Sequence, residues 1–153
     1  MPTFNFKDKY PVQADIHAPN PASDQATTLV FLTAIGVPLR KYSKFFKGLT
    51  ETGYTVIAAD YPCCGDNTPQ VDRSVDYNYQ DIVDGFIPKL LQLSEHKNTY
   101  LLGHSLGGHM ATIYSVLHDV PVKVRASTST SRAMIMPLTN LRKILPNCVP
   151  TRP

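Results

Sequence analysis

The sequence has no long hydrophobic run, and its longest apolar stretches have the length of a strand rather than of a membrane-spanning helix. Its first residues, MPTFNFKDKYPVQ, lack the basic segment followed by an apolar segment that makes a secretory signal. We therefore expect no membrane span and a cytoplasmic location. With 42% hydrophobic and 18% charged residues, the 153-residue chain suits a folded domain with a core rather than a disordered segment.

Cysteine is scarce, with three residues in the whole chain. Cys63 and Cys64 are adjacent, an arrangement that rarely forms a disulfide, and there is no C-x-x-C pair of the kind that binds metals. The thiols are therefore interpreted as reduced and structural. We expect no metal and no cofactor.

Acidic residues are almost absent from the last third of the chain. Residues 1–105 carry nine Lys/Arg and eleven Asp/Glu, whereas residues 106–153 carry six Lys/Arg and a single acid, Asp119. The basic residues are scattered singly, without the cluster that marks a nucleic-acid-binding surface, so no nucleic-acid partner is expected. The phosphate-binding pattern G-x-x-x-x-G-K-[ST] is absent as well.

What the chain does contain is a regular alternation of predicted strands and helices. Two short strands are expected near Phe4–Lys7 and Val12–His17, followed by four core strands at Thr27–Ile35, Tyr54–Asp60, Thr99–Leu102 and Val122–Ala126. Apolar residues at helical spacing predict helices from Tyr42 to Leu49, from Ile82 to Leu91 with an irregularity at Pro88, and from Leu106 to Leu117. A further short helix is predicted over Met134–Leu145. This order indicates an α/β fold with a mostly parallel sheet and helices on both faces.

The stretch LLGHSLGG places Ser105 between Gly103 and Gly107, in the pattern G-x-S-x-G, after a predicted strand and before a predicted helix. In that context the pattern predicts a nucleophile elbow, a sharp turn that exposes the serine hydroxyl. Glycine is needed two residues to either side because larger side chains would collide with neighbouring elements. The Leu106 N–H would face a developing oxyanion, and the positive end of the helix would add to its field. The side chain of His104 is expected to point away from the hydroxyl.

A second oxyanion donor is expected in the loop that follows the first core strand. Gly36 allows a ligand to approach the backbone closely. Because Pro38 has no N–H, the donor would be Gly36 or, as the alternative, Val37.

With these motifs the chain resembles the α/β-hydrolase superfamily, especially the predicted hydrolases of the serine aminopeptidase-like and monoacylglycerol-lipase-like groups. The similar segments are IGVPLRKYSKFFKGLTETGYTVIAADYPCCGDNT and YLLGHSLGGHMA. The resemblance implies a serine hydrolase that cleaves esters, thioesters or amides of a small acyl substrate through a covalent acyl-enzyme on Ser105. One departure is visible: family members usually have Arg-Gly-x-Gly after the Asp-Tyr pair, where this chain has Pro62-Cys63-Cys64-Gly65.

The partners of Ser105 are not found in the chain. In this fold the acid and then the histidine follow the serine, yet no histidine follows Asp119, and His109 and His118 lie along or at the end of the predicted helix. The resemblance implies that residues 1–130 form the N-terminal part of the hydrolase core, without its last strands, and that residues 131–153 begin a cap. The alternative is a catalytically inactive, hydrolase-like binding module that self-associates through an exposed sheet edge.

Overall fold

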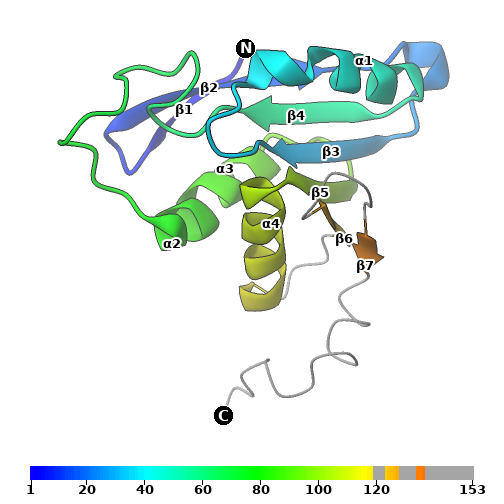
Figure 1. Cartoon of the computed structure of the whole chain (residues 1–153). Helices are drawn as coiled ribbons and strands as arrows, with labels where there is room; N and C mark the ends of the chain where they lie inside the picture. The colour runs from blue at the N-terminus through cyan, green and yellow to red at the C-terminus, as the bar shows by residue number, and fades with distance from the viewer. Residues whose placement is uncertain (119–122, 128–133, 137–153) are drawn as a thin grey trace.

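The computed structural model describes residues 1–118, 123–127 and 134–136. The described strands form a seven-stranded sheet in the order β1-β2-β4-β3-β5-β6-β7 (Figure 1). Their bounds are β1 Thr3–Phe6, β2 Tyr10–His17, β3 Thr27–Leu32, β4 Thr55–Ala59, β5 Asn98–His104, β6 Lys123–Ser127 and β7 Met134–Met136. The central pairs β4–β3, β3–β5 and β5–β6 are parallel, and the outer pairs are antiparallel.

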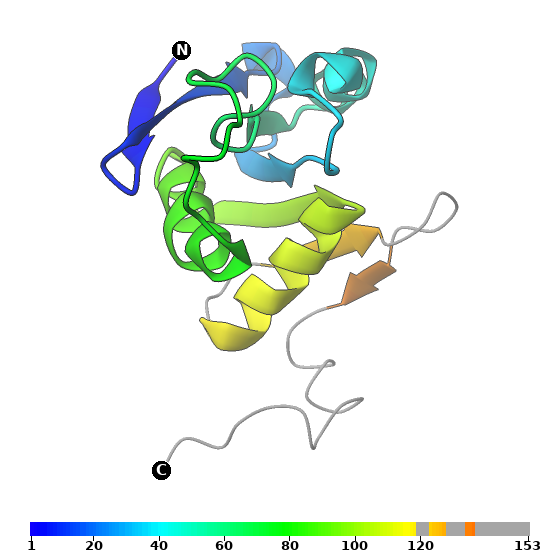
Figure 2. The same cartoon turned by 60° about the vertical axis from the view of Figure 1, so that its left-hand side comes forward.

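Helices cover both faces of this sheet (Figures 1 and 2). The 3-10 turn η2 (Leu39–Tyr42) and helix α1 (Ser43–Glu51) lie on one face, and a short 3-10 turn η1 (Pro21–Ser23) precedes β3. The other face carries α4 (Leu106–Leu117) and a continuous helical stretch made of α2 (Tyr79–Asp81), η3 (Ile82–Phe86) and α3 (Ile87–Leu91). The predicted α/β architecture is confirmed, with antiparallel strands added at both edges.

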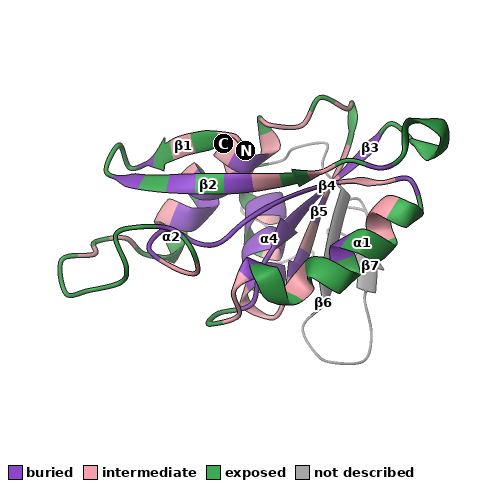
Figure 3. Ribbon diagram, turned by 90° about the horizontal axis from the view of Figure 1, so that it is seen from above, coloured by how far each residue is buried: buried purple, intermediate pink, exposed green. Residues whose placement is uncertain are grey.

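The alternation of side chains along the central strands explains this layering. In β3, Val30 and Leu32 join the cluster under α3 and α4, whereas Phe31 joins the cluster under α1. In β4, Ile57 belongs to the cluster under α3 and α4, and Val56 belongs to the cluster under α1. Because successive side chains of a strand point to opposite faces, strands that are apolar throughout require helices on both sides. Figure 3 shows the resulting run of buried residues through the sheet.

The irregularity expected at Pro88 is a π-helical turn. The N–H of Ile87 bonds to the carbonyl of Ile82, five residues back, and Pro88 follows near the start of α3. Proline has no N–H to donate and its ring crowds the carbonyl four residues earlier, so the wider turn accommodates it. The stretch starts at Asn78, whose side chain caps the Asp81 N–H at 3.1 Å.

Two sequence-based boundaries need correction. The first core strand ends at Leu32, three residues before Ile35, because the chain turns into a loop there. The helix predicted over Met134–Leu145 is wrong at its start, because Met134–Met136 form β7, antiparallel to β6. The remainder of that prediction, residues 137–145, lies outside the described residues.

A substitution at Phe86 tests the packing of the larger core cluster, the one under α3 and α4. The ring of Phe86 is fully buried and packs against Phe6 and Tyr61 at centroid distances of 6.3 and 5.4 Å. We expect Phe86→Ala to lower the free energy of unfolding by about 3–5 kcal/mol in urea titrations, because it leaves a cavity. Val71→Ala, at a side chain that is 63% exposed, should change it by less than about 0.5 kcal/mol. Equal effects of the two variants would contradict this core.

Candidate active site

Ser105 occupies a strained turn between β5 and α4. Strand β5 ends at His104, Ser105 has φ 52° and ψ −115°, and Leu106 opens the helix. A positive φ is costly for a residue with a β-carbon, so the surrounding structure must hold this conformation in place. The side chain of Ser105 is half-buried. This is the geometry that the G-x-S-x-G pattern predicts.

Close backbone contacts at the two flanking glycines hold the turn. A β-carbon at Gly103 would overlap the backbone of Gly107 and Gly108. A β-carbon at Gly107 would overlap the carbonyl of Leu32 and would lie 2.7 Å from that of Thr33. The first turn of α4 therefore lies directly against the end of β3.

This contact brings the loop after β3 next to the N-terminus of α4. As the first residue of the helix, Leu106 has no acceptor for its N–H within the helix. In the loop, the Val37 N–H donates to the Ala34 carbonyl at 3.2 Å, so the alternative donor is already engaged. For the N–H groups of Gly36 and Ile35, the described part of the chain offers no acceptor. Gly36 has φ 71° and open space around its Cα.

Tyr42 connects this loop to the serine turn. Its hydroxyl accepts the Ala34 N–H at 3.1 Å and lies 2.9 Å from Nδ1 of His104. The two rings also meet edge to face, with centroids 5.9 Å apart. The imidazole of His104 is therefore positioned by its contact with Tyr42, the last residue of η2. Burial raises the pKa of Tyr42 above its ordinary value, so its hydroxyl stays protonated.

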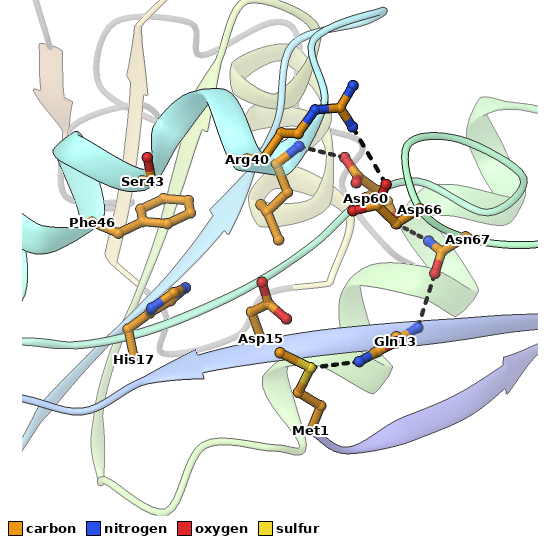
Figure 4. Close-up of a pocket in the computed structure, with 11 residues that line it drawn as sticks. Met1, Gln13, Asp15, His17, Arg40, Ser43, Phe46, Asp60, Asp66 and Asn67 are labelled. Carbon is orange, nitrogen blue, oxygen red and sulfur yellow. Dashed lines mark hydrogen bonds and ion pairs between the residues drawn. The ribbon is translucent and has the colours of Figure 1, made fainter.

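Asp60, directly after β4, connects η2 with the loop that follows β4, and Figure 4 shows it beside Arg40, Asp66 and Asn67. Its carboxylate accepts the Leu39 N–H at 2.7 Å and packs so closely on Gly65 that a β-carbon there would overlap it. Asn67 donates to the Asp60 carbonyl at 2.8 Å and accepts the Gln13 N–H at 3.0 Å. The loop after β4 is thus fixed to both η2 and β2. Burial raises the pKa of Asp60, opposed by hydrogen bonds from Leu39 and Asp66.

Beside these elements lies an apolar cavity of about 640 Å³, which we call the strand-end pocket. One wall is formed by the loop 33–38 with Leu106 and Met110. A second wall comes from the long segment that follows β4, from Tyr79 at the start of α2 and from Ile82 in η3. The residues that this second wall contributes are Tyr61, Cys63, Cys64, Gly65, Gln70, Val71, Tyr77 and Tyr79. A cavity of this size and lining suits an apolar ligand with a small polar group.

No imidazole contacts Ser105 in the part of the chain that the structure describes. The side chain of His109 is exposed on α4. The side chain of His118, at the far end of that helix, pairs with Asp84 at 2.9 Å and stacks on Tyr114. Asp119 lies outside the described residues. The structure therefore brings the serine turn next to the loop 33–38, and no imidazole among residues 1–118 is hydrogen-bonded to the Ser105 hydroxyl.

Residues 1–118, 123–127 and 134–136 contain no group of three or more His, Cys, Asp or Glu side chains placed to hold a metal ion. Their helices are all too short or too polar to cross a bilayer.

The two helical glycines Gly107 and Gly48 form a matched test of the backbone contact. We expect Gly107→Ala to lower the free energy of unfolding by several kcal/mol or to abolish cooperative unfolding, because the overlapping atoms belong to the backbone. Gly48→Ala, in α1 with nothing within 4 Å, should raise it by up to about 1 kcal/mol. Urea titrations that rank both variants as equally stable would contradict the packing at Gly107.

The raised pKa of Asp60 predicts that the free energy of unfolding depends on pH. Since its pKa is higher in the folded than in the unfolded chain, the folded state binds this proton more tightly, and its contribution to stability falls as pH rises through the folded pKa. Asp60→Asn keeps an acceptor for Leu39 and should remove that fall. The pKa of Asp72 is lowered by hydrogen bonds from Ser74, so this carboxyl contributes the opposite slope, stability that is lost as pH falls, and Asp72→Asn should remove that loss. Urea titrations between about pH 3 and 7 measure both slopes, and a wild-type profile unchanged in Asp60→Asn would refute the first.

Comparison with known proteins agrees with this geometry. The family model described as alpha/beta hydrolase fold matches residues 27–150. No curated protein matches the chain. Among solved structures, a carboxyl esterase from Bacillus coagulans has a TM-score of 0.68 at 20% identity, covering 80% of this chain and 41% of its own.

Two more structures show the same relation. A monoacylglycerol lipase from Paleococcus ferrophilus has a TM-score of 0.63 at 20% identity, covering 90% of this chain and 51% of its own. A structure from work on the carboxylesterases of Nitrososphaera gargenis has a TM-score of 0.63 at 22% identity, covering 80% and 42%. This chain spans two-fifths to about half of the length of these proteins. At such identities the likeness concerns the fold, and the family match identifies the chain as a member of the α/β-hydrolase fold family.

Proposed function

We propose that this chain is the N-terminal part of a serine hydrolase that cleaves an ester, thioester or amide through a covalent acyl-enzyme on Ser105. The observation that carries the proposal is the strained turn at Ser105, at φ 52°, between β5 and the first turn of α4. Backbone strain that the surrounding structure holds in place is found most often at active sites and ligand-binding sites. The neighbouring strand-end pocket is apolar and suits the acyl part of a small-molecule substrate.

In this proposal the hydroxyl oxygen of Ser105 attacks the substrate carbonyl. The Leu106 N–H and a donor from the loop after β3 bind the oxyanion that forms. We assign the second donor to Gly36, or to the adjacent Ile35, because the Val37 N–H bonds to Ala34. The sequence pattern pointed to Gly36 or Val37, and the side chain of Ile35 gives no sign of what its amide does.

The proton of the serine hydroxyl must pass to a base that the described residues do not contain. We propose that residues 1–130 are the core segment and that residues 131–153 begin a cap. The acid and the histidine would then belong to sequence beyond Pro153. Because this chain spans at most about half of the proteins it resembles, the activity is proposed for a chain that includes that sequence.

The second candidate is a binding module without turnover. It is favoured by one observation, that no imidazole reaches Ser105 in the described part of the chain. The strand-end pocket would then bind an apolar ligand reversibly. The module would self-associate through the sheet edge at β7, which within the described ranges pairs only with β6.

An alkyl fluorophosphonate probe distinguishes the two candidates in a chain that continues past Pro153 with an acid and a late histidine. We expect covalent labelling of the wild type and none of Ser105→Ala. Ser115→Ala, at a buried serine on the same helix, is the matched control and should retain the label. Labelling that survives in Ser105→Ala would refute the nucleophile. An unlabelled wild type that still binds an apolar fluorescent ligand would favour the binding module.

A further inference from the structure

Two consecutive thiols line one wall of the strand-end pocket. Cys63 and Cys64 both belong to this wall, in the loop drawn in green between β4 and α2 in Figure 1. Both are free thiols, the first buried and the second half-buried. Consecutive residues of an extended chain point in opposite directions, so a shared wall requires a turn.

The backbone of Cys63 supplies that turn. Its φ is 60°, in the left-handed region that glycine adopts at much lower cost. The turn is held by the Cys64 N–H bonding to the Tyr61 carbonyl at 2.9 Å and by the Asn67 N–H bonding to the Cys64 carbonyl at 3.0 Å. The chain thus keeps a side chain with a sulfur atom at a position where glycine would be relaxed. A non-glycine residue in such a conformation is a reason to look for a role of its side chain.

The surroundings of the two sulfur atoms favour a soft, apolar reagent. The pocket is mostly apolar, and burial raises the pKa of both thiols, so they are protonated at neutral pH. The hydroxyl of Tyr77, which also lines this pocket, donates to the Pro62 carbonyl at 2.7 Å. Hard cations need several oxygen ligands, whereas soft, thiophilic centres bind sulfur.

We propose that Cys63 and Cys64 form a dithiol site for a trivalent, thiophilic metalloid compound that carries an apolar group, represented by an organoarsenical. The apolar group occupies the strand-end pocket and the arsenic bridges the two sulfur atoms. The proposal does not involve Ser105, so its failure would leave the proposed hydrolase function untouched.

The reaction requires no oxidant. Phenylarsine oxide and the two thiols form two As–S bonds, while the arsenic–oxygen bonding and the two S–H bonds break. The oxygen leaves as one molecule of water, whose two hydrogens are the thiol protons. Arsenic remains trivalent throughout. Cys64 is the first to react because it is the more exposed, and the bound arsenic then meets Cys63 as an intramolecular neighbour.

Phenylarsine oxide added to the full chain tests the site by intact-mass spectrometry. We expect one adduct per chain, with the mass of the reagent less one water, that survives excess 2-mercaptoethanol and is removed by 2,3-dimercaptopropanol. Cys63→Ser and Cys64→Ser should each lose this resistance at least tenfold. Cys148→Ser, which removes the third cysteine, and Ser105→Ala should both retain it.

A measurement on the wild type avoids any dependence on how the variants fold. After trypsin digestion, the arsenic should lie within the peptide 48–73, which contains both Cys63 and Cys64 and lacks Cys148. Arsenic that links this peptide to the one containing Cys148 would overturn the proposal. So would a resistant adduct in either Cys63→Ser or Cys64→Ser.

Discussion

The contact on which the rest of the site depends is the approach of the α4 backbone to the end of β3. Gly107 lies against the carbonyls of Leu32 and Thr33, and Gly103 lies against Gly107. These contacts leave no room for a β-carbon, and they fix where the serine turn meets the loop with the free N–H groups. The strain at Ser105 persists because the sheet and the helix are both locked in position around it.

Around that contact, hydrogen bonds of polar side chains hold the loops in position. Tyr42 joins the loop 33–38 to His104, and Asp60 joins η2 to the loop after β4. Asp60 is buried and Tyr42 is half-buried, and burial raises the pKa of each. Their hydrogen bonds compensate for the desolvation of these groups and hold three segments that are distant in the sequence.

Much of this could be read from the sequence, because the relevant signals are local. Alternation of apolar segments predicted the layers, Pro88 predicted the irregular helix, and G-x-S-x-G predicted the turn at Ser105. The role of Tyr42 was not visible, since its spacing also fits the apolar face of α1, where its ring does pack. Asp60 was seen only as the end of a strand. The strand at Met134 was missed because a three-residue strand depends on its partner β6 and has no period of its own.

The strand-end pocket has walls of two different kinds. The wall formed by Leu106, Met110 and the loop 33–38 rests on the backbone contacts that glycine at 103 and 107 makes possible. The second wall comes mostly from the connection 61–78, which has no regular secondary structure. Asp60 and Asn67 anchor this connection near its start. No residue of that connection belongs to the serine turn itself, which lies between β5 and α4. The two walls of the pocket are therefore held by different sets of contacts, and the cysteine pair belongs to the wall that carries none of the turn.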